Sequence, residues 1–162
     1  VVPNRNAIFA SILYGYALSI ATKNDTSVKI GLGVHSGDHE IYPDCRPEFY
    51  DALEHAFQVG NWDSEKVSFY LPYLEGDKET ILKDAEKSLD KLNLDFDTIF
   101  ANTNTSYNPD EQGRSSGKSG ADIERILAFN AIGRKDPVPY VEDWSKVLEH
   151  AIKTEKEHKE KI

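Results

Sequence analysis

Residues 27–49 read SVKIGLGVHSGDHEIYPDCRPEF, and they contain a strand, a polar loop and the start of a helix in succession. The β-branched run at the beginning ends in glycine, which predicts a buried strand that leads into a loop. The helix has Pro47 in its first turn and closes near Gly60, the usual places for these residue types at helix ends. A buried strand followed by a helix indicates one unit of an α/β fold.

The segments on either side continue this alternation. Upstream, Asn4 is expected to cap a buried helix that runs to about Thr22. The apolar residues that recur along it at helical spacing are Ile8, Phe9, Ile12, Leu13, Tyr16 and Ile20. Downstream, the sequence predicts strands over residues 66–74 and 96–102, and helices over residues 77–94, 121–133 and 141–162. Strands alternating with helices predict an α/β fold with a parallel sheet flanked by helices.

Two parts are expected along the chain. Residues 1–101 are predicted to form the C-terminal portion of an α/β nucleotide-binding domain, and residues 102–162 a polar loop with C-terminal helices. The 162 residues include no methionine and begin with Val1. We therefore expect a piece of a longer protein, or a chain that was processed or redesigned.

Composition limits the classes of function. Hydrophobic residues make up 39% of the chain and charged residues 29%, which is typical of a globular protein, and no apolar run approaches the length of a membrane span. The net charge of −9 disfavours nucleic acid as a direct partner, although a local basic pocket can still hold a small anion. Cys45 is the sole cysteine, so no internal disulfide forms, and no signal peptide is visible. A cytoplasmic location is the default expectation.

The residues that could form a functional site are expected in the loops at the carboxyl ends of the predicted strands. The loop over residues 34–49 contains His35, Asp38 and His39, which together offer a possible metal site. The two histidines are four residues apart, but on a loop this spacing does not place them on one face. The other unusual loop covers residues 102–120 and is rich in asparagine, serine, glycine and threonine.

The stretch GRSSGKSGAD, residues 113–122, looks like a phosphate-binding P-loop but does not fit one. Only three residues separate Gly113 from Gly117, and the preceding predicted strand ends more than ten residues upstream. A different pattern fits better, with Ser106, Ser116, Ser119 and Asp122 at the spacing of a zinc knuckle that has lost its cysteines. Serine hydroxyls stay protonated and bind zinc poorly, so a flexible polar loop is the alternative.

Four motifs carry a family resemblance. They are VPNRN at residues 2–6, YPDCRPEF at 42–49, DK at 77–78, and SYN followed by SGKSGADIER within 106–125. In this order they resemble the 7-cyano-7-deazaguanine synthases, ATP-dependent ligases with a Rossmann-like PP-loop fold. The resemblance implies use of ATP and Mg²⁺, and structural zinc in the usual family form. Two departures stand out: the family's SGGxDS pyrophosphate loop is missing, with HSGDH at residues 35–39 no substitute, and serines replace the zinc cysteines.

The resemblance also implies roles for individual residues. Implied nucleotide-binding residues are Arg5, Asn6 and Lys78. Implied substrate-binding residues are Asp44, Arg46 and Asp38, and Asp38 is also a candidate magnesium ligand.

Simpler interpretations of these residues stay open. They are helix capping and a surface charge at residues 5–6, a helix N-cap with a local ion pair at residues 44–46, and a surface lysine at residue 78. Cys45 is expected to be a small buried residue, not a nucleophile. Arg125 is either part of the family pattern or an exposed helical arginine. No catalytic residue is assigned.

The implied reaction converts 7-carboxy-7-deazaguanine and ammonia to 7-cyano-7-deazaguanine through an acyl-adenylate and an amide. Without the pyrophosphate loop, the chain alone is expected to be inactive. One alternative is a divergent ligase that joins a deazaguanine to a macromolecule in nucleic-acid modification or defence. Another alternative is a non-catalytic partner subunit or scaffold. Its exposed sheet edge would favour association. Loss of the zinc knuckle would loosen residues 102–120. Expected partners are the missing N-terminal portion or a partner chain, with homo-oligomers possible and no membrane.

Overall fold

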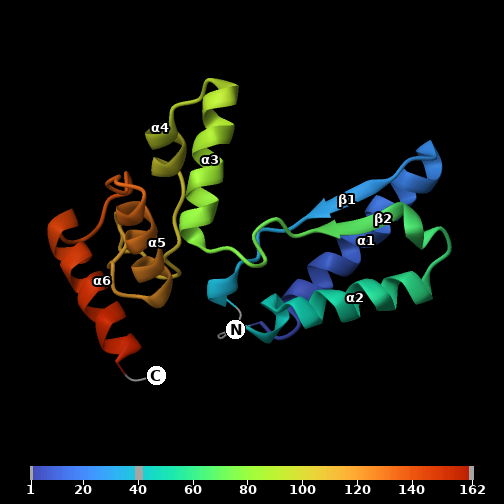
Figure 1. Ribbon diagram of the computed structural model, residues 1–162, viewed down its shortest axis with the longest axis horizontal. Coiled ribbons are helices and arrows are strands. Elements are labelled where there is room, and N and C mark those ends of the chain that lie inside the picture. Colours follow the sequence, from blue (N-terminus) through green and yellow to red (C-terminus); the bar gives the residue numbers. More distant parts are fainter. Residues whose placement is uncertain (1, 39–41, 161–162) are drawn as a thin grey trace. The chain divides into compact units, whose positions relative to one another are not determined.

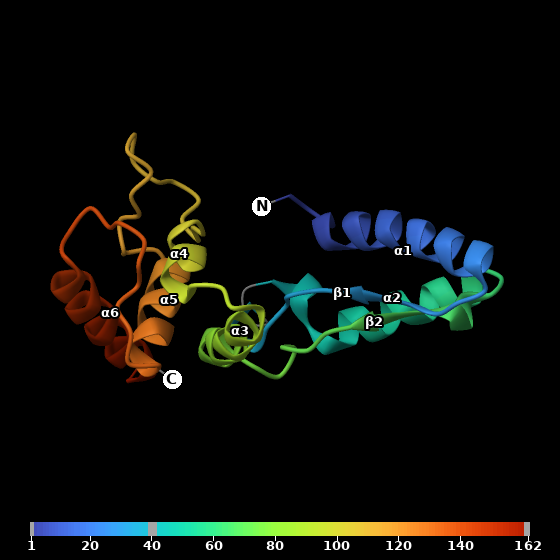
Figure 2. The same ribbon diagram turned by 90° about the horizontal axis from the view of Figure 1, so that it is seen from above.

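The computed structural model describes residues 2–38 and 42–160. The chain divides into two compact units, Val1–Asp77 and Lys78–Ile162 (Figures 1 and 2). The division by role that the sequence predicts, at residues 101 and 102, stays a prediction. Within the described ranges, every helix is too short or too polar to cross a bilayer.

The first unit contains a two-stranded parallel sheet flanked by helices, which confirms the predicted fold class. β1 (Val28–Gly31) pairs with β2 (Val67–Tyr70) in a register that runs from Val28 opposite Val67 to Gly31 opposite Tyr70. Helices α1 (Arg5–Asn24) and α2 (Pro47–Gly60) lie along these strands (Figure 1). Three short 3₁₀ turns connect them: η1 (Ser36–Asp38), η2 (Pro43–Cys45) and η3 (Ser64–Lys66).

One face of the sheet carries the core of this unit. Side chains alternate along a strand, so Ile30 and Val67 point to the same face, where they pack with Tyr14, Ala17 and Ala21 of α1. Phe57 of α2 joins this cluster and stacks on the Tyr14 ring at 4.4 Å between centroids. On the opposite face, Lys29, Gly31 and Tyr70 are exposed. Parallel sheets are normally covered on both faces, whereas within the described part of the first unit these three residues of the second face stay exposed.

Helix α1 turns its large apolar side chains outward. The buried residues are Ala10, Tyr14, Ala17 and Ala21, which recur along one stripe of the helix. The opposite side, called the α1 outer face below, leaves 43–68% of each side chain exposed and consists of Ile8, Phe9, Ile12, Leu13 and Tyr16. The prediction that this helix is buried is therefore wrong for these described residues. Asn4 does occupy the N-cap position, but its side chain makes no capping hydrogen bond.

The second unit is helical, with α5 (Gly120–Ala131) packed between two sets of partners. Helices α3 (Lys78–Leu92) and α4 (Phe96–Ala101) contribute Leu82, Leu89 and Phe96 to a cluster around Phe129 of α5. Helix α6 (Trp144–Lys159) lies beside α5 (Figure 1), and its Val147 and Ala151 pack against Ile126 of α5. Trp144 packs against both clusters. The predicted helices of this region are confirmed, with the last one ending at Lys159.

The strand predicted over residues 96–102 is wrong, because this segment forms helix α4. Asp95 caps the helix: its carboxylate accepts hydrogen bonds from the Thr98 backbone N–H at 2.8 Å and from the Thr98 hydroxyl at 2.5 Å. Phe96 and Phe100, four residues apart, then lie on one side of the helix against Phe129. An N-cap aspartate followed by an i, i+4 aromatic pair outweighs the weak strand preference of so short a run.

Candidate functional site

The start of α1 and the YPDCR segment meet in the first unit. The Asn6 side-chain amide donates to the Asp44 backbone carbonyl at 3.1 Å and contacts the Cys45 sulfur at 3.5 Å. These residues are 38 and 39 positions apart in sequence. Asn6 is thus not a helix cap, and Arg5 beside it is exposed. The structure brings together a predicted nucleotide-binding motif and a predicted substrate-binding motif.

The YPDCR segment presents its polar residues and buries its cysteine. Cys45 is 5% exposed, which confirms the interpretation of a small buried residue. Asp44 in η2 is partly buried, and the exposed Arg46 occupies the N-cap position of α2 without a side-chain capping bond. Burial, aided by the nearby Cys45 and Asp44, raises the pKa of Tyr50 to about 12. The Tyr50 phenol is therefore neutral at physiological pH beside this segment.

The loop after β1 is tied to the loop after β2. Both the backbone N–H and the hydroxyl of Ser36 donate to the Gly76 carbonyl, at 2.8 and 2.6 Å. Asp38 ends η1, His35 is buried, and His39 lies outside the described residues, so the predicted His35, Asp38 and His39 metal site stays a hypothesis. Within residues 2–38 and 42–160, no three His, Cys, Asp or Glu side chains converge as metal ligands.

Lys78, predicted to contact phosphate, lies at the start of α3. Its ammonium group forms an ion pair with the Glu124 carboxylate of α5. Both residues belong to the second unit, and the lysine side chain is 21% exposed. A phosphate at Lys78 would compete with this carboxylate. The role in nucleotide binding stays a prediction.

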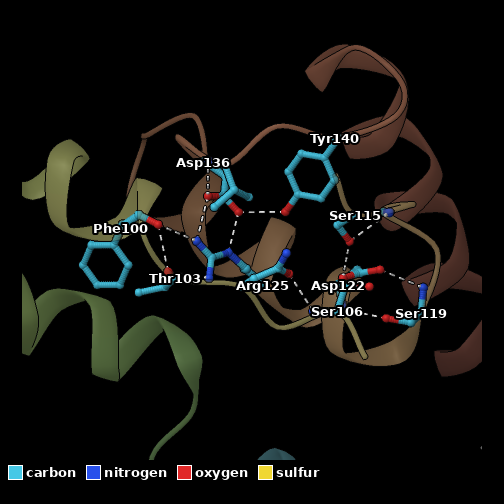
Figure 3. Close-up of polar contacts among 12 residues, drawn as sticks. Phe100, Thr103, Ser106, Ser115, Ser119, Asp122, Arg125, Asp136 and Tyr140 are labelled. Atoms are coloured by element: carbon cyan, nitrogen blue, oxygen red, sulfur yellow. Dashed lines mark hydrogen bonds and ion pairs between the residues drawn. The ribbon is translucent and has the colours of Figure 1, made fainter. Parts of the chain in front are cut away.

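The loop that the spacing predicts to be a zinc knuckle without its cysteines is organised around Asp122. One oxygen of its carboxylate accepts from the Ser115 hydroxyl at 2.6 Å, and the other accepts from the Ser119 backbone N–H at 3.3 Å and the Ser116 hydroxyl at 3.5 Å. The Ser119 hydroxyl in turn accepts from the Asp122 backbone N–H, which completes a capping box at the start of α5 (Figure 3). Ser106 accepts instead from the Asn108 backbone N–H at 3.3 Å.

These residues do not fit a zinc ion. Structural zinc sites are built from thiolates and imidazoles, whereas three of the four donors here are neutral hydroxyls. The one anionic donor, Asp122, is 1% exposed and already accepts hydrogen bonds on both carboxylate oxygens. The Ser116 and Ser119 hydroxyls also accept from backbone N–H groups. Zinc at these positions would have to displace this set of hydrogen bonds.

Beside the knuckle, Arg125 forms a buried ion pair that the sequence did not reveal. Its guanidinium donates to the two Asp136 carboxylate oxygens at 2.6 and 2.9 Å, and also to the Thr103 hydroxyl and the Phe100 carbonyl (Figure 3). Arg125 is 6% exposed, so the alternative of an exposed helical arginine is wrong. Tyr140 donates to Asp136 at 2.7 Å. Asp136 and Tyr140 have no local motif that marks them as partners of α5.

The pH dependence of this cluster follows from Tyr140. Burial, and then the negative charge of Asp136, raises the pKa of the Tyr140 hydroxyl well above its usual 10. The hydroxyl therefore stabilises the folded state fully below about pH 10, and this contribution is lost as the pH rises toward the folded-state pKa. We expect the unfolding free energy of the second unit to fall more steeply above pH 10 in the wild type than in Tyr140→Phe. Urea titrations across that range measure the difference, and the exposed Tyr107→Phe provides a control that should follow the wild type.

Comparisons with known proteins confirm the family that the four motifs predict. The chain matches a family model described as queuosine biosynthesis protein QueC over residues 1–133. It is 43% identical to the 7-cyano-7-deazaguanine synthase of Psychromonas ingrahamii over 140 residues, which cover 86% of this chain and 56% of that protein. The synthase of Marinomonas sp. is 41% identical over the same shares, and that of Caldicellulosiruptor saccharolyticus 37% identical over 86% and 55%. The chain thus spans little more than half the length of these relatives. No solved structure gave a significant match.

Proposed function

Because the chain belongs to the queuosine biosynthesis protein QueC family, we propose that it forms part of an ATP-dependent ligase that makes 7-cyano-7-deazaguanine. In this reaction the carboxylate of 7-carboxy-7-deazaguanine attacks ATP, releasing pyrophosphate and forming an acyl-adenylate. Ammonia displaces AMP to give the amide. A second ATP adenylates the amide oxygen and releases a second pyrophosphate, and departure of that oxygen in AMP together with loss of both N–H protons leaves the nitrile. Magnesium would balance the charge of the phosphates.

The observation that carries the proposal is the contact between Asn6 and the segment at Asp44 and Cys45. It supports a single site in which the VPNRN motif lies beside the nucleotide and the YPDCR motif beside the base. In that site the Asp44 carboxylate would accept hydrogen bonds from ring N–H groups of the deazaguanine. Arg46 would bind the substrate carboxylate with two parallel hydrogen bonds, because a guanidinium matches the geometry of a carboxylate.

The ligase also needs a segment that grips pyrophosphate, and the 162 residues contain no SGGxDS sequence. We propose that this loop comes from an α/β segment that packs on the α1 outer face and adds to the sheet. Three observations support this. The α1 outer face is a large exposed apolar surface, the second face of the sheet is exposed at Lys29, Gly31 and Tyr70 in the described part of the first unit, and two strands alone rarely form a stable sheet. The relatives are also longer than this chain, with about 44% of their length unmatched.

The test uses the chain co-expressed with the part of the Psychromonas ingrahamii synthase that it does not match. We expect this assembly to convert 7-carboxy-7-deazaguanine, ATP and ammonia to the nitrile, as followed by mass spectrometry. Arg46→Met should lower kcat/KM by about 10- to 150-fold, the loss of one charge-assisted hydrogen-bonded contact of about 1.5–3 kcal/mol. The exposed cation Lys23, in the last turn of α1, is the matched control, and Lys23→Met should keep full activity.

The outcomes separate the alternatives. An assembled protein without nitrile production, or an Arg46→Met variant as active as the control, would contradict the proposed function. Nitrile production by the 162-residue chain alone would contradict the need for a second segment. Transfer of the deazaguanine to a nucleic acid or protein, detected as label on the macromolecule, would favour a divergent ligase instead.

A further inference from the structure

The serines and Asp122 at the predicted zinc positions do not fit a zinc ion. Residues 102–119 must therefore be held in place by other contacts. Residues 102–119 are tied to α5 near both ends. At the start of the loop, Arg125 of α5 donates to the Thr103 hydroxyl at 2.9 Å. At its end, Asp122 of α5 accepts from Ser115 and Ser119. Asp122 and Arg125 are three residues apart, so both lie on the same side of the helix (Figure 3).

The middle of the loop also has its own hydrogen bonds. Asp110 accepts from the Arg114 backbone N–H and from its guanidinium, both at 2.8 Å, which closes the tip of the loop. Ser115 then pairs with the segment before α6: its N–H donates to the Pro139 carbonyl at 3.3 Å, and its carbonyl accepts from the Val141 N–H at 2.9 Å. Gly117 follows with a positive φ of 73°, and a side chain there would meet Val147 of α6 at 2.7 Å.

We propose that this unit folds without a metal, and that the buried Asp122 carboxylate takes over the role the family gives to zinc. A zinc ion joins four side chains because each donates electrons to one central cation. Here the centre is an anion, and Ser115, Ser116 and Ser119 all donate hydrogen bonds to it. The position of Asp122 in the first turn of α5 also favours a negative charge, because the N-terminal end of a helix is partly positive. The expectation that residues 102–120 loosen without zinc is replaced by this proposal, which does not depend on ligase activity.

The first test measures metal on the wild-type 162-residue chain. The protein is incubated with excess zinc sulfate, dialysed, and analysed for zinc by mass spectrometry, and urea unfolding is then recorded with and without EDTA. We expect zinc at background level and the same urea midpoint in both conditions. One retained zinc per chain, or a lower midpoint in EDTA, would overturn the proposal. This readout does not require any variant to fold.

The second test removes the central acceptor. Asp122→Asn keeps the size of the side chain but replaces one acceptor oxygen with a donor group that faces other donors. We expect the folding equilibrium constant to fall by about 10- to 150-fold, the range for hydrogen bonds to a charged group. The exposed Glu149→Gln on α6 is the control, with no change expected. An Asp122→Asn variant as stable as this control would show that the carboxylate does not hold the loop.

Discussion

Arg125→Met will lower the unfolding free energy of the second unit by about 3–5 kcal/mol, the usual effect of breaking one partner of a buried ion pair. Methionine keeps much of the arginine side-chain volume but leaves the Asp136 carboxylate, 1% exposed, without its cation. The Thr103 hydroxyl and the Phe100 carbonyl each lose a donor in the same change. The desolvated charge accounts for most of the expected loss.

The measurement is urea unfolding followed by the fluorescence of Trp144, which packs against both clusters of the second unit. The chain has two tryptophans, and Trp62 is 94% exposed, so a Trp62→Phe background isolates the signal without disturbing a core. Lys153→Met, which breaks the exposed pair with Glu157, should change stability by less than about 0.5 kcal/mol. A loss below about 1 kcal/mol in Arg125→Met would contradict the account.

A double variant tests whether the stranded charge is the cause. In Arg125→Met with Asp136→Leu, no buried charge remains, and an apolar pair of similar volume can be as stable as the ion pair. We expect the double variant to be more stable than Arg125→Met alone. Additive losses would instead mean that both side chains matter for their packing, not for their charges.

If the proposed α/β segment packs on the α1 outer face, Ile12→Asp will weaken its binding by at least about 100-fold. Burial of an isoleucine side chain is worth about 1.5–3 kcal/mol, and a buried unpaired carboxylate adds a further penalty. In the chain by itself the same substitution should change the unfolding free energy by less than about 0.5 kcal/mol, because Ile12 is 66% exposed there. Co-purification of the unmatched part of the Psychromonas ingrahamii synthase measures the binding.

Ala17→Asp provides the matched contrast on the same helix. Ala17 is buried against the sheet, so an aspartate there should destabilise the first unit even with no partner present. The opposite behaviour of residues 12 and 17 would show that α1 has one face for its own core and another for a partner. Loss of self-association in Ile12→Asp, without any binding of the α/β segment, would instead identify a second copy of this chain as the occupant.

The sequence predicted the parallel sheet and most helices correctly because β-branched runs, glycine and proline mark their ends locally. The sequence does not show which side of α1 is buried. Apolar residues lie on both sides of this helix, so helical spacing alone cannot tell which side packs on the strands. The structure puts the stripe of Ala10, Ala17 and Ala21 inside, where small side chains allow the helix to come close to the sheet. The larger residues, which the periodicity favoured, remain outside.

The candidate site shows a similar limit. Motif order in the sequence identified Asn6 and Asp44 separately, but only the fold reveals that the amide of one reaches the backbone of the other. Burial of Arg125 was not predictable either, because its partner Asp136 lies eleven residues on, beyond the end of α5. The serine knuckle was recognised by spacing, whereas the way in which Asp122 binds the serines required coordinates.

Gly117 constrains the path of the loop independently of the residues at the predicted zinc positions. A Cβ atom at this position would lie 2.7 Å from a Val147 side-chain carbon, so any other residue would force Val147 or the loop to shift, and the φ of 73° disfavours a side chain as well. Neither constraint involves the atoms at positions 106, 116, 119 and 122. Substitutions at these four positions can therefore leave the route of the chain past α6 unchanged, because steric exclusion at a single glycine keeps that route.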